Sequence, residues 1–224
     1  MSGHAILIGH DVAGWQADLR NVENWLLSIP DIAFAGNITR IANGDATSGR
    51  IKQAIRAKGE FLTYDDFLVI YYSGHGMQRR SGAVADADGF CQVIKTQDGP
   101  LTDAEFWDLW VGFSDAVRVL FITDCCHSEG VASTLSDKTP RISLIHLSAC
   151  SNSQESRGND KGGRFTNGLI AAMKAGGGAY EAVVREVNRI VALPDQEAHI
   201  SSYGMYCDSF KAQRPFDPEC LLPV

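Results

Sequence analysis

The chain has 224 residues, of which 45% are hydrophobic and 21% charged, and this is enough apolar material for one soluble domain with a sizeable core. Its net charge of −7, from 27 acidic and 20 basic residues, argues against nucleic acid or an anionic membrane as the main partner. The same acidity suits a protein that acts on cationic groups.

The composition also indicates a reducing compartment. The first apolar run, residues 5–8, is far too short to span a bilayer and has no basic lead-in, so neither a signal peptide nor a membrane span is predicted. The six cysteines include no CxxC pair and lack the dense spacing of a secreted disulfide-rich domain. We therefore expect a cytosolic protein with reduced thiols and without a structural zinc site.

Short apolar segments alternate with helical patterns from the N-terminus onward. A strand is predicted over residues 4–8, and helices over about 16–27 and 48–58. Residues 66–72 (DFLVIYY) are rich in aromatic and β-branched side chains, as expected of a strand buried on both faces.

The alternation continues through the rest of the chain. A helix over residues 102–110 begins with a capping box, in which Thr102 is the N-cap and Glu105 stands three residues on. This pattern predicts an α/β domain with a mostly parallel sheet and helices on both faces. The later elements are strands at 116–123, 142–148 and 199–203 and helices at 165–174 and 180–190.

Two unusual segments directly follow predicted strands. Ser73-Gly74-His75-Gly76 follows the strand at 66–72, and Asp124-Cys125-Cys126-His127-Ser128 follows the strand at 116–123. Ligands of parallel sheets bind beyond the carboxyl ends of the strands, so we expect both segments at one edge of the sheet.

Together the two segments contain the parts of a thiol-dependent catalytic site. A thiol becomes a nucleophile when it is deprotonated, and a neighbouring histidine assists. We expect Cys126 to attack the scissile carbonyl and His75 to protonate the leaving amine. The N–H groups of Gly76 and Cys126 are candidates for an oxyanion hole, where one donor contributes roughly 3–4 kcal/mol. Taken singly, such a histidine or cysteine is more often structural, so the pairing carries the argument.

YYSGHG followed by DCCHS resembles the peptidase C14 group, which has the caspase fold. His75 and Cys126 are 51 residues apart, close to the roughly 50 residues that separate this pair in caspases. The DCCHS segment is similar to the metacaspase DxCHSG pattern rather than to the QAC-type segment of animal caspases. The resemblance is therefore to metacaspases and prokaryotic orthocaspases, and by this match the nucleophile is Cys126 and not Cys125.

The resemblance covers most of the chain, from the AILIG strand through Leu147-Ser148-Ala149-Cys150 to the helix start at Gly163-Arg164-Phe165-Thr166. It implies a caspase-like three-layer α-β-α sandwich with a central, mostly parallel six-stranded sheet. It also implies one peptidase domain over residues 1–224, with a large-subunit-like part at 1–140 and a small-subunit-like part at 141–224.

A pocket for a basic side chain is a further implication of the resemblance. Asp124 matches the acid that contacts the residue before the cut in metacaspases, and Ser73 matches a second lining position. A carboxylate in a partly desolvated slot pairs with guanidinium and repels an acidic side chain, so cleavage after Arg or Lys is expected. The other reading of Asp124 is a cap on a turn or helix start.

The chain departs from the metacaspase pattern at two positions near this pocket. Asn21 stands where metacaspases often place another pocket acid, which predicts a less negative pocket. Glu129 interrupts the HSG pattern, and it either compensates for the missing acid or faces solvent.

Calcium is a cofactor of many metacaspases, but the acids that match its ligands are few here. Asp88 and Asp103 roughly match two ligand positions, while Ala104 stands where an adjacent acid is expected. Calcium takes six to eight oxygen ligands, so two carboxylates make a poor site. We expect that no cofactor is required.

The resemblance implies protein or peptide substrates and favours a monomer, with neither nucleic acid nor membrane as partner. It also implies possible self-processing in two polar loops, residues 129–141 and 151–164. The basic residues there are Lys138, Arg141, Arg157, Lys161 and Arg164.

Other classes of protein fit the sequence less well. A cysteine phosphatase needs an arginine six residues after its nucleophile, and Val131 and Ala132 occupy those positions. A Rossmann-like binding domain needs a GxGxxG turn after the first strand, which is absent. A non-catalytic caspase-fold scaffold stays open, because the sequence does not show that His75 and Cys126 meet.

Overall fold

A computed structural model describes residues 2–64, 66–80, 89–113, 117–132 and 136–217. Six strands form its central sheet, and five of them are parallel, as predicted. These strands are β1 (Gly3–Gly9), β2 (Ile38–Ala42), β3 (Phe67–Ser73), β7 (Arg118–Asp124), β8 (Ser143–Ser148) and β11 (His199–Gly204). Their order across the sheet is β11-β8-β7-β3-β1-β2, and β11 runs antiparallel to β8.

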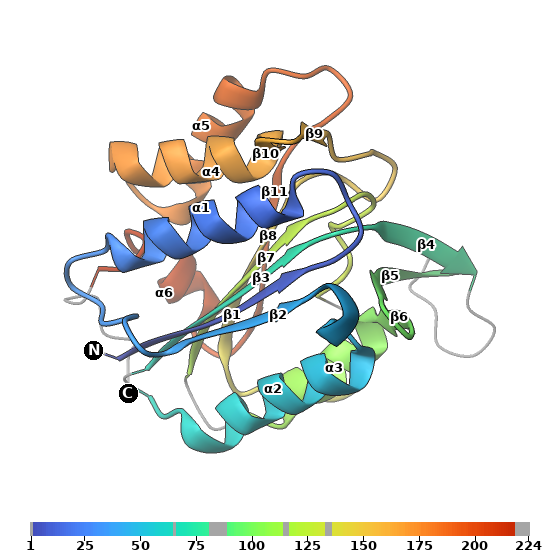
Figure 1. The fold of residues 1–224 in the computed structure, drawn as a ribbon. Coiled ribbons are helices and arrows are strands. Elements are labelled where there is room, and N and C mark those ends of the chain that lie inside the picture. Colours follow the sequence, from blue (N-terminus) through green and yellow to red (C-terminus); the bar gives the residue numbers. More distant parts are fainter. Residues whose placement is uncertain (1, 65, 81–88, 114–116, 133–135, 218–224) are drawn as a thin grey trace.

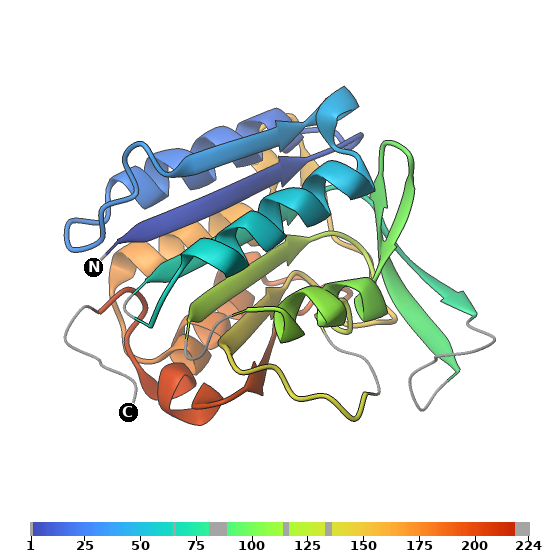
Figure 2. The ribbon, with the colours of Figure 1, turned by 90° about the horizontal axis from the view of Figure 1, so that it is seen from below.

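Helices cover both faces of this sheet and complete the predicted three-layer sandwich (Figures 1 and 2). The first face carries α1 (Trp15–Leu27), α4 (Arg164–Ala175), α5 (Tyr180–Val191) and α6 (Cys207–Ala212), and the second carries α2 (Ser48–Phe61) and α3 (Asp103–Val111).

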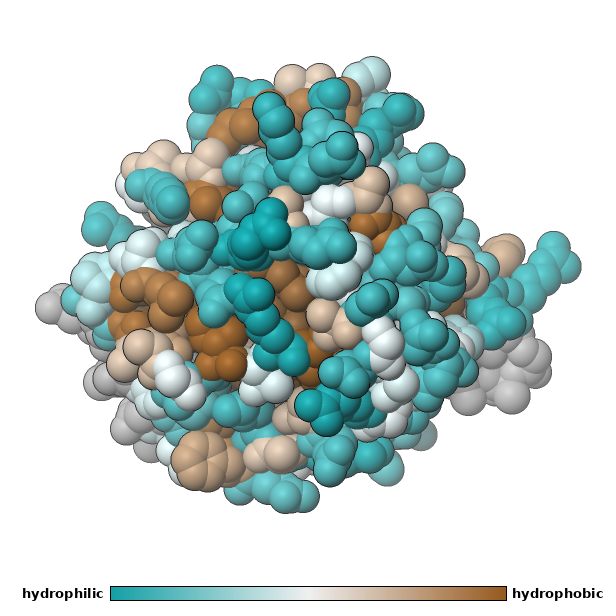
Figure 3. Space-filling model, viewed as in Figure 1, coloured by the Kyte–Doolittle hydropathy of each residue, from teal (hydrophilic) through white to brown (hydrophobic). Residues whose placement is uncertain are grey.

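Each face has its own hydrophobic core, because successive side chains of a strand point to opposite sides. In β1, Ala5 and Leu7 belong to the core under α1 and α4, whereas Ile6 and Ile8 belong to the core under α2 and α3. This double burial explains the nearly continuous apolar runs of the central strands. The exterior seen in Figure 3 is largely hydrophilic, with separate apolar patches.

The predicted capping box is confirmed at the start of α3. Thr102 Oγ1 accepts a hydrogen bond from Glu105 N at 3.2 Å, and Glu105 Oε2 accepts one from Thr102 N at 3.0 Å. Other predicted elements are present with boundaries that differ by a few residues, as usual at fraying ends.

Several short elements were not predicted from the sequence. A three-stranded antiparallel sheet projects beyond the carboxyl ends of the central strands (Figure 1). Its strands are β4 (Gly76–Arg80), β5 (Phe90–Thr96) and β6 (Gly99–Thr102), and β9 (Gly158–Asn159) and β10 (Gly162–Gly163) form a separate small ribbon.

The register of the central strands sets the position of the site. Gly9 in β1 pairs with Ser73 in β3, and Ser73 pairs with Asp124 in β7, so the three strands end at one level. The two unusual segments therefore leave the sheet side by side, as predicted. The division into parts 1–140 and 141–224 stays a prediction.

Candidate active site

A pocket of about 330 Å³ lies at the carboxyl edge of β1, β3 and β7. His75 and Cys126 both line it, so the fold brings the two predicted catalytic residues to one cavity. Ser73, Asp124 and Ser156 also line it.

Gly76 allows the histidine and cysteine segments to touch. A Cβ atom there would collide with the carbonyl oxygen of Cys126 and lie 2.8 Å from Cys125 Sγ, so any larger residue would separate the segments. His75 itself follows β3, and its main-chain oxygen accepts hydrogen bonds from Lys95 N (2.9 Å) and the Tyr72 hydroxyl (2.9 Å). The loop that carries the imidazole is thus fixed through its backbone.

The N–H of Gly76 is directed away from β5. His75 and Lys95 occupy a hydrogen-bonded position of the β4–β5 ladder, so the next pair, Gly76 and Ile94, occupies a non-hydrogen-bonded one. In that position the main-chain N–H points outward from the pair, so β5 does not accept a hydrogen bond from it.

Cys126 and Cys125 differ sharply in exposure. Cys125 is 1% exposed within the core, and burial raises the pKa of its thiol well above the ordinary value. Cys126 is half-buried at the pocket. Burial raises the pKa of the Cys126 thiol, a main-chain hydrogen bond with Ser156 opposes that rise, and Glu155 and Asp124 add to it. Cys126 is the accessible thiol, and it needs a base.

The turn after Cys126 is anchored to residues 150–154. His127 adopts a left-handed conformation with φ of 53°. Its main-chain N donates to Gln154 O at 3.1 Å, and its Nδ1 lies 2.6 Å from Asn152 O. Ser128 Oγ donates to Cys150 O at 3.3 Å. His127 therefore serves as a structural residue of the turn.

Asp124 lines the pocket and also caps the first turn of α4. It is 6% exposed and lines the pocket, and its Oδ2 accepts hydrogen bonds from Thr166 N (3.1 Å) and Thr166 Oγ1 (2.6 Å) in the first turn of α4. Its Oδ1 accepts a bond from Ser156 Oγ at 2.5 Å. Burial raises the pKa of Asp124, while the bonds from Ser156 and Thr166 oppose the rise.

The expectation for Asn21 was wrong, because the second pocket acid is Asp18, one turn earlier in α1. Asn21 bonds to Asn167 Oδ1 at 3.2 Å and does not line the pocket. Asp18 lines it and is 2% exposed. Ser73 Oγ donates to Asp18 Oδ2 at 2.8 Å, so the predicted lining residue Ser73 is bound to this acid. The missed signal was helical spacing, since Asp18 shares the apolar face with Val22.

The Asp124 carboxylate raises the cost of ionising Asp18. The pKa of Asp18 is raised from its ordinary 3.8 to about 6, first by burial and then by Asp124, while bonds from Ser73 Oγ and Gly163 N oppose the rise. Gly163 N donates to Asp18 Oδ1 at 2.8 Å, and a Cβ at Gly163 would collide with the Asp124 carboxylate. Among the described residues, neither of these two acids forms an ion pair with a cation.

Glu129 faces away from the pocket. Its Oε1 lies 3.7 Å from Nδ1 of His199 in β11. It is not among the residues that line the pocket, so it does not replace a pocket acid.

Of the two proposed calcium ligands, the structure describes only Asp103. Asp103 is 1% exposed, and its two oxygens accept hydrogen bonds from Gln92 N and Ala104 N, both at 2.6 Å. Asp88 lies outside the described residues. Within the described ranges, no group of three or more His, Cys, Asp or Glu side chains is placed to hold a metal ion.

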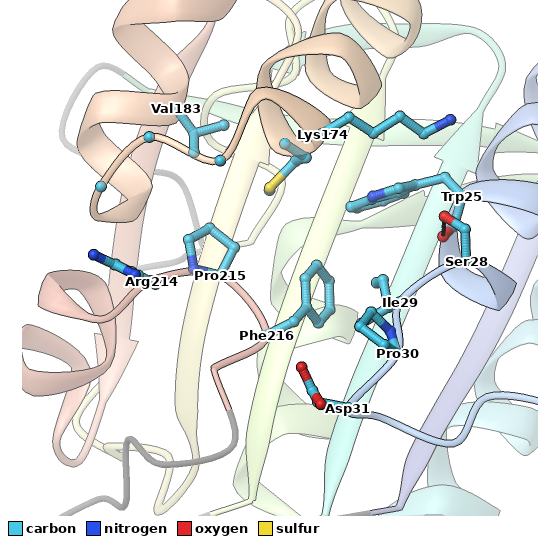
Figure 4. A pocket seen from close by; sticks show the side chains of 14 residues that line it. Trp25, Ser28, Ile29, Pro30, Asp31, Lys174, Val183, Arg214, Pro215 and Phe216 are labelled. Carbon is cyan, nitrogen blue, oxygen red and sulfur yellow. Dashed lines mark hydrogen bonds between the residues drawn. The ribbon is translucent and has the colours of Figure 1, made fainter.

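A second pocket, of about 370 Å³, lies near the opposite edge of the sheet (Figure 4). Its walls include Trp25, Met173 and Phe216, with Asp31 and Lys174 at its rim. Its described lining contains neither histidine nor cysteine, so it offers no nucleophile and base for acyl transfer. The cysteines that the structure describes form no disulfide with one another. No described helix is long and apolar enough to cross a membrane.

The fold, with His75 and Cys126 lining one pocket at the carboxyl edge of the sheet, is that of a caspase-like protein. A family model, the caspase domain of peptidase C14, matches residues 2–216, and the chain belongs to this family. Among curated proteins it is similar to Metacaspase-4 and Metacaspase-6 of Arabidopsis thaliana, with 32% and 31% identity over 144 residues. These matches cover 58% of this chain but only 34% and 39% of the two metacaspases.

Solved structures give the same fold. A Geobacter sulfurreducens protein aligns with a TM-score of 0.81 at 24% identity, over 96% of this chain and 98% of that one. Caspase-1 from Spodoptera frugiperda aligns with a TM-score of 0.65 at 17% identity, over 91% of this chain and 87% of that one. The predicted caspase-like sandwich is confirmed.

Proposed function

We propose that this chain is a cysteine endopeptidase that cleaves proteins and peptides after Arg or Lys. The observation that carries the proposal is a single pocket lined by His75 and Cys126 together with two buried acids, Asp18 and Asp124. A basic side chain entering beside the two acids leaves its carbonyl carbon near the thiol at the pocket mouth.

The catalytic steps follow from the chemistry of these groups. His75 takes the proton of the Cys126 thiol, which attacks the scissile carbonyl. The Gly76 and Cys126 N–H groups stabilise the oxyanion of the tetrahedral intermediate. His75 then gives the proton to the leaving amine, and water hydrolyses the acyl-enzyme.

The preference for basic residues follows from the charge of the pocket. Binding of a cation favours ionisation of both acids, and a charge-assisted hydrogen bond contributes roughly 1.5–3 kcal/mol. An aspartate in the same position would face two carboxylates in a desolvated site. Arginine, with its fork of donors, can bond to both acids at once.

A panel of fluorogenic peptides that differ only in the residue before the cut tests the proposal. We expect cleavage after Arg and Lys, and loss of activity to background in Cys126→Ala and His75→Ala. Cys207→Ala is the matched control, because Cys207 in α6 is half-buried but does not line the pocket. Cleavage after Asp, or activity that survives Cys126→Ala, would refute it.

The scaffold alternative makes a different prediction for an irreversible, arginine-directed thiol reagent. A peptidase is labelled at Cys126, and His75→Ala slows the labelling. A scaffold is not labelled, and the His75 substitution changes nothing. We further propose that the protein acts as a monomer in the cytosol and needs no calcium.

A further inference from the structure

Gln196 connects the loop after α5 to the segment that borders the catalytic pocket. It is 3% exposed. Its Oε1 accepts a hydrogen bond from Arg157 N at 3.1 Å, and its Nε2 donates to Ala149 O at 3.3 Å and to Ser156 Oγ at 3.4 Å. Asp195, the preceding residue, forms an ion pair with the guanidinium of Arg157. Two neighbouring side chains thus hold residues 156 and 157.

Ser156 interacts with both the Asp124 carboxylate and Cys126. Its hydroxyl donates to Asp124 Oδ1 at 2.5 Å, and so orients a carboxylate of the specificity pocket. Its main chain forms a hydrogen bond with Cys126 that favours the thiolate. A shift of residue 156 would therefore disturb substrate binding and nucleophile activation together.

Nothing in the catalytic motifs points to Gln196, which lies 70 residues after Cys126 in a partly exposed loop. A buried amide costs free energy unless its donors and acceptor are bonded. The Gln196 amide bonds to residues 156 and 157 beside the pocket and to Ala149, which directly follows β8. It therefore joins these two segments.

We infer that Gln196 is a positioning residue, which holds Ser156 where it supports both the Asp124 carboxylate and the Cys126 thiolate. The inference rests on the proposed peptidase function for its effect on cleavage. Its effect on the thiol does not depend on the substrate. Gln196 itself touches neither the reacting thiol nor the imidazole.

Gln196→Leu keeps the volume of the side chain but removes its hydrogen bonds. Asn188→Leu is the matched control, because Asn188 Nδ2 donates to Ala198 O (3.0 Å) and its Oδ1 accepts from Ala198 N (2.7 Å). Asn188 therefore anchors the same loop through the same kind of bonds, but away from the pocket.

Two measurements separate positioning from a merely structural role. The first is kcat/KM with an arginine peptide, which we expect to fall roughly tenfold in Gln196→Leu, equivalent to about 1.4 kcal/mol. The second is the rate of Cys126 alkylation by iodoacetamide against pH, read by peptide mass spectrometry. We expect the profile of Gln196→Leu to move to higher pH, while that of Asn188→Leu stays with the wild type.

Ser156→Ala provides a second line of evidence, because it leaves the bonds of Gln196 with Arg157 N and Ala149 O in place. It removes the hydroxyl from Asp124 but keeps the main-chain N–H, so we expect a raised KM with an unchanged alkylation profile. The inference would be overturned if Gln196→Leu and Asn188→Leu had the same alkylation profile and the same kcat/KM. A wild type without peptidase activity would refute the proposed function alone, because the alkylation profiles still test the positioning role.

Discussion

At the scale of single residues, the acid pair Asp18 and Asp124 links pH to both stability and binding. Folded Asp18 keeps its proton up to about pH 6, whereas the unfolded chain loses it near 3.8. The folded state therefore binds more protons between these values, and stability falls as the pH rises through them. Across this pH interval, the protein without bound substrate loses about 3 kcal/mol of folding stability.

Asp18→Asn tests this linkage directly. The variant keeps a side-chain oxygen for Gly163 N but carries no charge, so we expect it to be more stable than the wild type above pH 6 and similar below pH 4. Its kcat/KM for an arginine peptide should fall roughly 10- to 100-fold, since one charge-assisted hydrogen bond is lost. Urea unfolding at several pH values checks the stability, and peptide kinetics check the change in kcat/KM.

Asn21→Ala is the control for the Asp18 substitution, because Asn21 lies in the same helix and bonds to Asn167 outside the pocket. It should change neither the pH dependence of stability nor kcat/KM. An Asp18→Asn variant that cleaves the arginine peptide like the wild type would remove Asp18 from the specificity pocket.

The adjacent thiols Cys125 and Cys126 should respond to substitution in opposite ways. Cys126→Ala should abolish cleavage with little change in thermal stability, because its side chain is only half-buried. Cys125→Ala should keep cleavage within a few-fold and lower stability by about 1 kcal/mol, since it removes a buried sulfur atom beside Gly76. Peptide kinetics and melting curves distinguish the two. The reverse pattern would make Cys125 the nucleophile.

At the scale of elements, the small ribbon of β9 and β10 shapes the floor of the pocket. A Cβ at Gly163 would collide with the Asp124 carboxylate, which Thr166 and Ser156 already hold in place. Gly163→Ala should therefore raise KM for basic substrates roughly tenfold and cost about 1–3 kcal/mol of stability through overpacking.

Gly177→Ala is the matched control, because a Cβ at Gly177 would meet nothing within 4 Å. It should leave kinetics unchanged and stability equal or slightly higher. Steady-state kinetics and denaturant unfolding on both variants check the prediction. Unchanged KM in Gly163→Ala would mean that the Asp124 carboxylate is not needed in its present position.

The elements that the sequence predicted well are those with a strong local signal. Long apolar strands, amphipathic helices and the Thr102 capping box were all recognisable. Strands β2, β4 and β5 were missed because they mix polar and apolar residues at a sheet edge or in a projecting sheet. Edge and ribbon strands depend on tertiary pairing more than on their own residues.

The residues of the site also divide into those with a local sequence signal and those without one. His75 and Cys126 were predicted because both follow buried strands that end at one sheet edge. Asp18 and Ser156 reach the pocket from a helix face and a loop, and Gln196 bonds to Ser156 from a second loop. The contacts of these three residues span 32 to 145 residues of sequence. Local patterns do not specify such long-range hydrogen bonds, so Asn21 was matched in place of Asp18.

At the scale of the whole molecule, the described residues gather no group of three or more His, Cys, Asp or Glu side chains that could hold a metal ion. Asp103, one of the two proposed calcium ligands, has both oxygens bonded to main-chain N–H groups. We therefore expect peptidase activity and melting temperature to be unchanged by excess EGTA. Activity that is lost with EGTA and restored by calcium would show a site that includes residues outside the described ranges.

Self-processing, if it accompanies the proposed activity, depends on which basic residues a second molecule can reach. Lys138 and Arg141 are exposed in the irregular segment between β7 and β8. Arg157 and Arg164 are joined by a main-chain hydrogen bond of 2.9 Å, within the segment that supports the pocket. Proteolysis prefers exposed irregular segments, so we expect cuts after Lys138 or Arg141.

Intact-mass spectrometry of the wild type beside Cys126→Ala measures this processing. We expect fragments ending at Lys138 or Arg141 in the wild type, an uncut chain in Cys126→Ala, and cutting of that variant when a trace of wild type is added. A Lys138→Gln, Arg141→Gln double variant should stay uncut while it still cleaves an arginine peptide, because both positions lie outside the pocket lining. Cuts after Arg157 or Arg164 would contradict the prediction, since they sever the segment that holds Ser156 beside Cys126 and Asp124.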